Sequence, residues 1–89
     1  MQVHFFAAAR AAAGTAQTTV QLQALPAATL QALIDHLGEH HTGTTPSGLN
    51  LAQVMEQCSF LVNGQRAERT ATLEADDLRV DVLPPFAGG

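Results

Sequence analysis

The stretch TLQALIDHLGEHH, residues 29–41, decides the fold because its apolar side chains recur at the spacing of a helix. Leu30, Leu33, Ile34 and Leu37 stand at positions i, i+3, i+4 and i+7, which form one apolar stripe along an α-helix. Thr29 is a suitable N-cap, because its hydroxyl can accept a hydrogen bond from a free N–H of the first turn. We therefore expect an amphipathic helix that lies with its apolar face on a sheet.

Two short strands are expected before this helix. Residues 2–7 (QVHFFA) are rich in β-formers and partly alternate, and residues 17–23 (QTTVQLQ) alternate in the same way. The alanine-rich residues 8–16 lie between them, and Gly14 interrupts their helical pattern. The pattern predicts a hairpin whose long connection contains about one helical turn.

Further strands are expected after the helix. Residues 59–68 (SFLVNGQRAE) indicate strand, turn and strand, because Asn63-Gly64 supplies the positive backbone angles of a type I′ turn. Residues 78–83 (LRVDVL) alternate between apolar and polar side chains, which is typical of a strand with one buried face.

The predicted order of elements is β-β-α-β-β, and a further short strand around Arg66 after the Asn-Gly turn remains open. A loop at 42–50 and a short helical piece at 51–55 follow the main helix, and Leu73 is expected to fill the core. One mixed sheet with one main helix packed across it buries each apolar face once, and the crossover makes a late strand parallel to an early one. We therefore expect an α+β fold of the β-grasp (ubiquitin-like) type in residues 1–83, followed by an extended tail at 84–89.

Composition narrows the possible partners. The chain of 89 residues has a formal charge of −4 and no lysine, and its four arginines are scattered, so a nucleic-acid partner is not expected. Cys58 is the one cysteine, which rules out an internal disulfide and favours a cytoplasmic location. No apolar run reaches the length of a membrane span, and no basic leader precedes the first strand, so no membrane partner is expected.

The tail PPFAGG, residues 84–89, carries the main chemical hypothesis. Pro84 and Pro85 cannot continue a strand ladder and favour an extended form, while Phe86 can anchor the tail in an apolar pocket. Ala87, Gly88 and Gly89 have little or no side chain and need only a narrow channel. The group that such a tail delivers is the carboxylate of Gly89, which can attack ATP to form an acyl-adenylate. A frayed terminus is the alternative.

Other residues offer weaker hypotheses. Phe6, Leu61 and Leu83 point away from their core neighbours and are expected to form a partner-binding patch, which Arg10 flanks, unless a second helix covers it. His36 and His40 have a zinc-compatible spacing, but a third ligand from Asp35, Glu39 or His41 is unconvincing, so no metal is expected. Cys58 has no basic neighbour in sequence and suits a buried structural role.

Three stretches together resemble the small subunit of molybdopterin synthase (MoaD), a family of ubiquitin-like sulfur carriers. They are FFAAARAAAG (5–14), LVNGQ (61–65) and VDVLPPFAGG (80–89). Phe6, Ala7, Arg10 and Gly14 match the family's N-terminal pattern, and residues 84–89 match its ending. The chain departs from the family in three places. At EADD (74–77) a Gly-containing turn is common in the family, and residues 11–13 lack the polar residue often found after the arginine. The loop at 42–50 is also long.

The resemblance implies a mechanism. A ubiquitin-activating-like adenylating enzyme would activate Gly89 with ATP, and a persulfide donor would convert it to a thiocarboxylate. Residues 84–89 would then enter the large synthase subunit and give sulfur to cyclic pyranopterin monophosphate, a step of molybdenum cofactor biosynthesis. The chain itself would bind no cofactor and would be a non-catalytic subunit of the complex. A carrier for thiazole or cysteine synthesis, a ubiquitin-like protein modifier and a plain interaction module remain alternatives.

Overall fold

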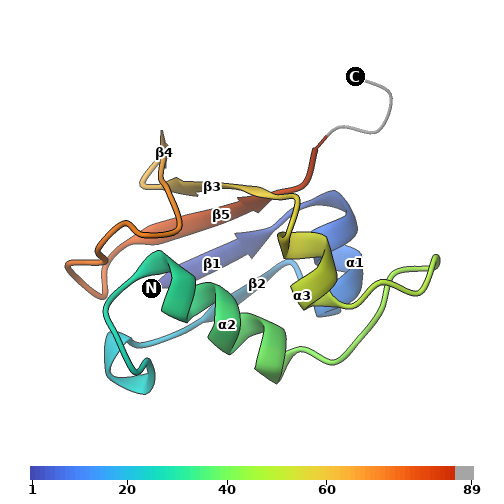
Figure 1. Ribbon diagram of the computed structural model, residues 1–89, viewed down its shortest axis with the longest axis horizontal. Coiled ribbons are helices and arrows are strands. Elements are labelled where there is room, and N and C mark those ends of the chain that lie inside the picture. The colour runs from blue at the N-terminus through green and yellow to red at the C-terminus, as the bar shows by residue number, and fades with distance from the viewer. Residues whose placement is uncertain (86–89) are drawn as a thin grey trace.

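A five-stranded sheet forms the centre of the computed structural model, which describes residues 1–85 (Figure 1). Its spatial order is β2-β1-β5-β3-β4, with β1 and β5 parallel and the other neighbours antiparallel. The predicted crossover is therefore confirmed, since the first and last strands run side by side in the middle of the sheet. The strands are β1 Gln2–Phe5, β2 Gln17–Thr19, β3 Ser59–Val62, β4 Gln65–Arg66 and β5 Arg79–Leu83.

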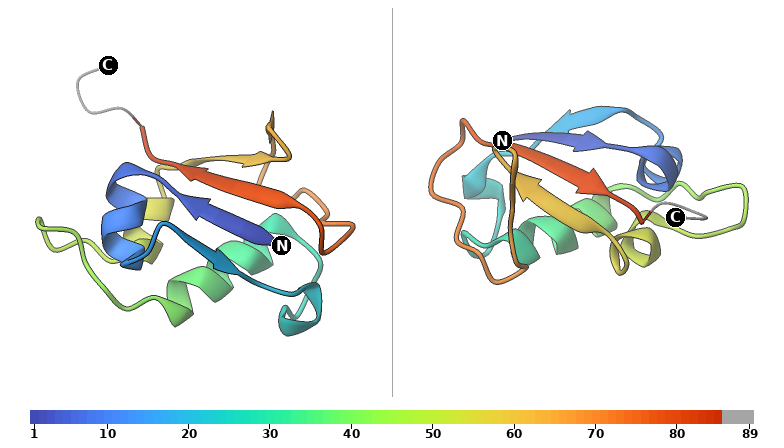
Figure 2. Two further views of the ribbon diagram at one scale, coloured as in Figure 1. Left: turned by 180° about the vertical axis from the view of Figure 1, so that it is seen from behind. Right: turned by 90° about the horizontal axis from the view of Figure 1, so that it is seen from above.

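The helices gather on one side of the sheet (Figure 2). The main helix α2, Leu30–His40, lies across the strands, and the short helix α3, Leu51–Met55, packs beside it. Thr29 caps α2 as predicted, because its Oγ1 accepts a hydrogen bond from the N–H of Ala32 at 3.2 Å. Asn50 and Gln53 form a capping box that starts α3 after the loop.

Two elements differ from the sequence-based expectation. The alanine-rich stretch forms a full helix, α1 Ala7–Ala13, which buries Ala9 and Ala12 and ends at Gly14 in the left-handed region (φ 75°). The second strand stops at Thr19 instead of continuing to Gln23, because Leu22–Ala24 forms a 3₁₀ turn (η1). In both places tertiary packing of small or half-buried side chains decided between structures that the local sequence allowed.

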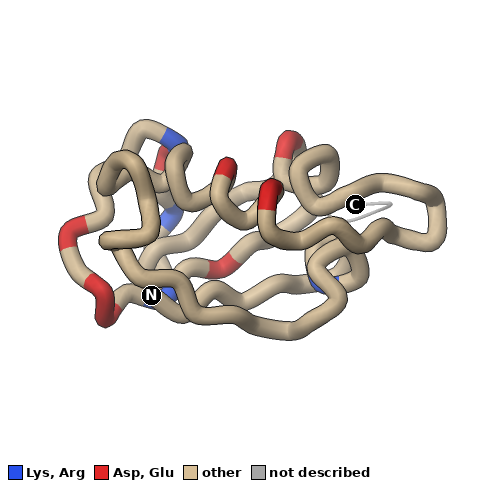
Figure 3. Tube along the Cα trace, turned by 90° about the horizontal axis from the view of Figure 1, so that it is seen from below, with Lys and Arg blue, Asp and Glu red and all other residues tan. Residues whose placement is uncertain are grey.

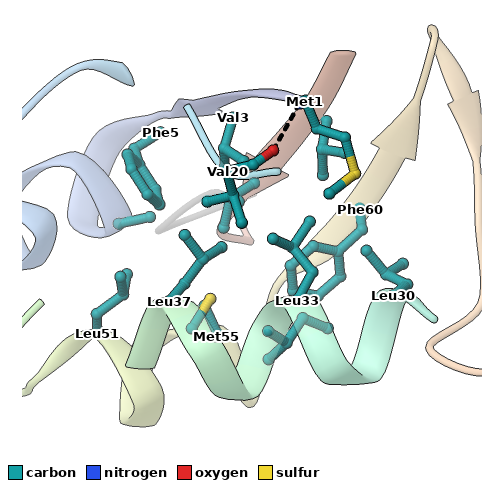
Figure 4. Packing of buried hydrophobic residues seen from close by; sticks show 14 of the residues in the cluster. Met1, Val3, Phe5, Val20, Leu30, Leu33, Leu37, Leu51, Met55 and Phe60 are labelled. Carbon is teal, nitrogen blue, oxygen red and sulfur yellow. Dashed lines mark hydrogen bonds between the residues drawn. The ribbon is translucent and has the colours of Figure 1, made fainter. Parts of the chain in front are cut away.

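One hydrophobic core holds the helices against the sheet (Figure 4). Val3, Val80 and Val82 are fully buried on the inner sheet face, and Leu33 and Leu37 of α2 pack against them. Leu73 is also buried, as predicted, although it belongs to the long connection before β5. The rest of this buried cluster comes from all three helices, β1, β3 and neighbouring residues: Met1, Phe5, Ala9, Ala12, Val20, Leu30, Ile34, Leu51, Val54, Met55 and Phe60.

The charged residues are dispersed over the structure (Figure 3). Acidic side chains lie mostly on the helix side and in the connection before β5, and the four arginines form no cluster within residues 1–85. None of the helices in this part of the chain is long and apolar enough to cross a membrane.

Candidate functional site

The base of the tail is fixed by the central strand of the sheet. Leu83 is the last residue of β5 and lies opposite Ser59 of β3. Pro84 is half-buried and Pro85 is exposed, and neither has an N–H to extend the ladder. The proposed site residues Phe86, Ala87, Gly88 and Gly89 lie outside the described residues. The structure thus shows where the tail leaves the fold, at the end of a strand paired on both sides.

An apolar spot lies beside this exit on the outer face of the sheet. Phe6 continues the line of β1 in an extended conformation, and its N–H donates to the carbonyl oxygen of Val82 at 3.3 Å. Because Phe5 is opposite Val82 in the parallel register, Phe6 lies next to Leu83 on the outer face. Phe6 is 39% exposed, one of the two large apolar side chains in residues 1–85 with such exposure. Phe6 and Leu83 therefore form a continuous surface with the start of the tail.

Leu61 shares this face but is separated from Phe6 by polar side chains. It lies opposite Asp81, which lies opposite His4 on the other side. The carboxylate of Asp81 is held by Arg79, whose Nε lies 2.8 Å from its Oδ1. The outer face thus has an apolar end at Phe6 and Leu83, a charged middle, and the half-buried Leu61 on β3. The helices of the described chain gather on the inner face of the sheet (Figure 2), so none of them covers this surface.

Arg10 stands one helical turn beyond Phe6. Its N–H donates to the carbonyl oxygen of Phe6 at 3.4 Å, and its side chain is exposed on α1. The structure therefore brings Phe6, Leu83 and Arg10 to the same end of the sheet as the tail exit.

A groove on the other side of the tail was not foreseen from the sequence. Its volume is about 310 Å³, and Ala8, Leu49, Val54, Pro84 and Pro85 are among its lining residues. Leu49 is 44% exposed at its edge. The loop sequence around Leu49 carries no periodic signal, and only the packing of α1 against α3 brings it near Pro84.

The remaining candidate residues lie elsewhere. The rings of His36 and His40 are stacked on α2, and no group of three or more His, Cys, Asp and Glu residues able to hold a metal occurs within 1–85. Cys58 is half-buried, and its Sγ donates to the carbonyl oxygen of Val54 at 3.3 Å. Burial raises the pKa of the Cys58 thiol from 9.0 to about 11, and the nearby charge of Arg69 opposes this shift. At neutral pH Cys58 is a protonated structural thiol.

Comparison with known proteins identifies the family. The model of the ThiS family matches residues 3–89, almost the whole chain and all of residues 84–89. The chain belongs to the ThiS family. The β-grasp (ubiquitin-like) fold predicted from the sequence is thereby confirmed.

Two solved structures from Haloferax volcanii share this fold. The solution structure of the HVO 2177 protein has 24% identity and a TM-score of 0.68, and the alignment covers 99% of this chain and 84% of that one. The crystal structure of SAMP1 has 21% identity and a TM-score of 0.67, with 99% and 97% covered. At these identities the likeness concerns the fold alone. No curated protein sequence gives a significant match.

Proposed function

We propose that this ThiS-family chain is the sulfur carrier of molybdopterin synthase and works as a thiocarboxylate on Gly89. The observation that supports this best is the position of the sequence PPFAGG. This sequence follows the central strand β5 directly along the chain, and β5 ends beside the exposed Phe6. A partner that binds this surface receives the tail in a fixed direction, since Pro84 and Pro85 are stiff and the next residues are small.

The proposed chemistry takes place in three steps on one carboxylate. The Gly89 carboxylate attacks the α-phosphorus of ATP and releases pyrophosphate, giving an acyl-adenylate. The terminal sulfur of a persulfide then displaces AMP, and a second thiol attacks the other sulfur of the resulting acyl disulfide. This releases the thiocarboxylate and leaves a disulfide on the donor.

The third step transfers the sulfur. Within the large synthase subunit the thiocarboxylate sulfur attacks a side-chain carbon of cyclic pyranopterin monophosphate and displaces an oxygen substituent from that carbon. Water then hydrolyses the resulting thioester, so that the sulfur stays on the pterin and the Gly89 carboxylate returns. The adenylating enzyme supplies the ATP site and the large subunit supplies the acid-base groups. The carrier contributes a docking surface and a co-substrate, binds no cofactor and works in the cytoplasm. Its role in the complex is that of a non-catalytic subunit.

Related carriers are the first alternative. A carrier for thiazole or cysteine synthesis has the same fold and Gly-Gly ending, and only the Pro84-Pro85-Phe86 context favours the molybdopterin role. A ubiquitin-like protein modifier would join Gly89 to lysines of other proteins. The likeness to SAMP1 concerns the fold and does not favour this alternative.

A transfer assay separates these roles. The protein with a Gly89 thiocarboxylate is mixed with a candidate large synthase subunit and cyclic pyranopterin monophosphate, and dithiolene formation and the intact mass are followed. We expect product together with a return of the tail from sulfur to oxygen, and neither with the unmodified carboxylate as the matched control. Absence of transfer to a large subunit that is active with another carrier would exclude the molybdopterin role and leave the alternatives.

A further inference from the structure

Two histidines on the outer side of α2 are not used by the proposed function. His36 and His40 are one helical turn apart and line a hollow of about 650 Å³ between α2 and the segment that precedes it. His36 is half-buried and His40 is exposed. The hollow lies on the helix layer, whereas Phe6 and Leu83 lie on the opposite face of the sheet.

The two imidazole rings are already side by side. Their centroids are 4.0 Å apart and the planes differ by 23°. Nδ1 of His40 lies 2.8 Å from the carbonyl oxygen of His36. A carbonyl oxygen only accepts, so in the neutral ring the proton of this hydrogen bond is on Nδ1 and Nε2 keeps its lone pair. A backbone carbonyl that fixes one ring nitrogen while the other is free is the usual arrangement behind a metal-bound histidine.

The spacing suits one small metal ion. Two imidazole nitrogens bound to one tetrahedral Zn²⁺ at about 2.0–2.1 Å lie roughly 3.3 Å from each other. The two rings are stacked with centroids 4.0 Å apart, so both side chains must turn about their χ torsions before their Nε2 lone pairs point at one ion. The i, i+4 spacing of two histidines on one helix face permits this rearrangement. Glu39 lines the same hollow, so the helix reads His-x-x-Glu-His, a spacing that zinc-binding helices use.

His41 does not complete the site. Its Nδ1 lies 3.3 Å from the carbonyl oxygen of Ala13, and its ring meets the edge of the Phe5 ring at a centroid distance of 5.4 Å. Asp35 also lines the hollow, but its Oδ1 accepts a hydrogen bond from Gln31 Nε2 at 2.9 Å. Two imidazoles and water molecules are therefore the coordination that the described residues support.

From this geometry we propose that His36 and His40 bind one divalent late transition-metal ion, such as Zn²⁺ or Cu²⁺, through their Nε2 atoms. Imidazole is a preferred ligand for these ions. With two protein ligands the site exchanges its ion with solvent. Its position on the helix layer leaves the tail exit uncovered.

Zn²⁺ titration of the untagged full chain, followed by calorimetry in a non-chelating buffer, tests the proposal. We expect one ion per chain, and at least tenfold weaker binding in His36→Gln and in His40→Gln. His4→Gln is the matched control, because His4 lies on the other face of the sheet, and we expect its affinity to stay within twofold. Failure of the native chain to bind Zn²⁺, or unchanged affinity in both variants, would overturn the proposal.

A second measurement needs no substitution. Cu²⁺ bound to the native chain is examined by electron paramagnetic resonance, in which each coordinated imidazole nitrogen splits the signal. We expect the pattern of two equivalent nitrogens from one site. A pattern from one nitrogen or none would contradict the paired site even if the variants failed to fold.

Discussion

Asn63 and Arg79 are joined by two hydrogen bonds that tie the β3–β4 turn to the start of β5. The N–H of Asn63 donates to the carbonyl oxygen of Arg79, and the N–H of Arg79 donates to Oδ1 of Asn63, both at 2.8 Å. Asn63 also has a positive φ of 49°, followed by Gly64 at 81°. One side chain thus permits the left-handed turn and fixes the strand that leads to the tail.

Replacing Asn63 separates these two roles. Asn63→Gly keeps the backbone conformation and loses the side-chain hydrogen bond, which is worth about 0.5–1.5 kcal/mol. Asn63→Ala loses the same bond and adds the cost of a left-handed backbone, about 1 kcal/mol or more. We expect the alanine variant to lose more free energy of unfolding than the glycine variant in urea denaturation. Equal losses in the two variants would show that the turn angle costs nothing here.

This turn was predictable because its signal is local. Asn-Gly between two apolar runs needs no tertiary contact to be recognised, and the helix stripe of Leu30 to Leu37 is equally local. Helix α1 was not foreseen in full, because Ala9 and Ala12 are small enough for a loop or a helix. Both side chains are buried where α1 packs near α3, and this tertiary packing favours the helix.

The candidate site could likewise be predicted only in part from the sequence. Alternation along β1 and β5 placed Phe6 and Leu83 on the outer face, and the parallel register then made them neighbours. The charged pair Arg79–Asp81 that separates Phe6 from Leu61 depends on the order of strands in the sheet, which spacing alone does not define. Leu49 was not predicted as a site residue, because the path of a loop in the folded chain brings it to the groove that Pro84 also lines.

Phe6 is the side chain with which the proposed docking surface is best tested. Because it is 39% exposed, Phe6→Asp removes little core packing, but it places a charge in the centre of an apolar contact. We expect sulfur transfer in the proposed assay to fall at least tenfold, with an almost unchanged midpoint of thermal unfolding. Gln2→Asp, on the outer face at the far end of β1, is the matched control and should transfer sulfur normally. Normal transfer by Phe6→Asp would remove Phe6 from the docking surface.

Arg69 holds the connection before β5 against α3. Its Nη2 donates to the carbonyl oxygen of Met55 at 2.5 Å, and its guanidinium lies 5.2 Å from the centre of the Phe60 ring. Arg69→Met removes a charged hydrogen bond and a cation–π contact, and we expect a loss of about 1–3 kcal/mol in the free energy of unfolding. Arg66→Met, at an exposed position on β4, is the control and should change stability by less than about 0.5 kcal/mol. Similar losses in both variants would mean that the contacts of Arg69 contribute little.

Cys58 provides a pH-dependent prediction. Burial raises its thiol pKa from 9.0 to about 11, despite the nearby charge of Arg69. Two units correspond to about 100-fold less thiolate at pH values well below 9, and the thiolate is the reactive form. We therefore expect iodoacetamide to alkylate the native protein at pH 8 at least tenfold more slowly than the urea-unfolded chain. The folded state keeps the Cys58 thiol proton to a higher pH than the unfolded chain does. The stabilisation of the folded state by the protonated thiol is therefore complete below pH 9 and is lost as the pH rises from 9 to 11.

The variant Cys58→Ser connects this prediction to function. A carrier that receives sulfur only on Gly89 does not need a second sulfur atom, so the thiocarboxylate form of Cys58→Ser should transfer sulfur at the native rate. The serine hydroxyl can keep the hydrogen bond to the carbonyl oxygen of Val54, which makes it a conservative replacement. In the alkylation experiment on the native protein, a rate equal to that of the unfolded chain would contradict a thiol that is half-buried and protonated. Slower transfer by a normally folded Cys58→Ser would show that the sulfur passes through this residue.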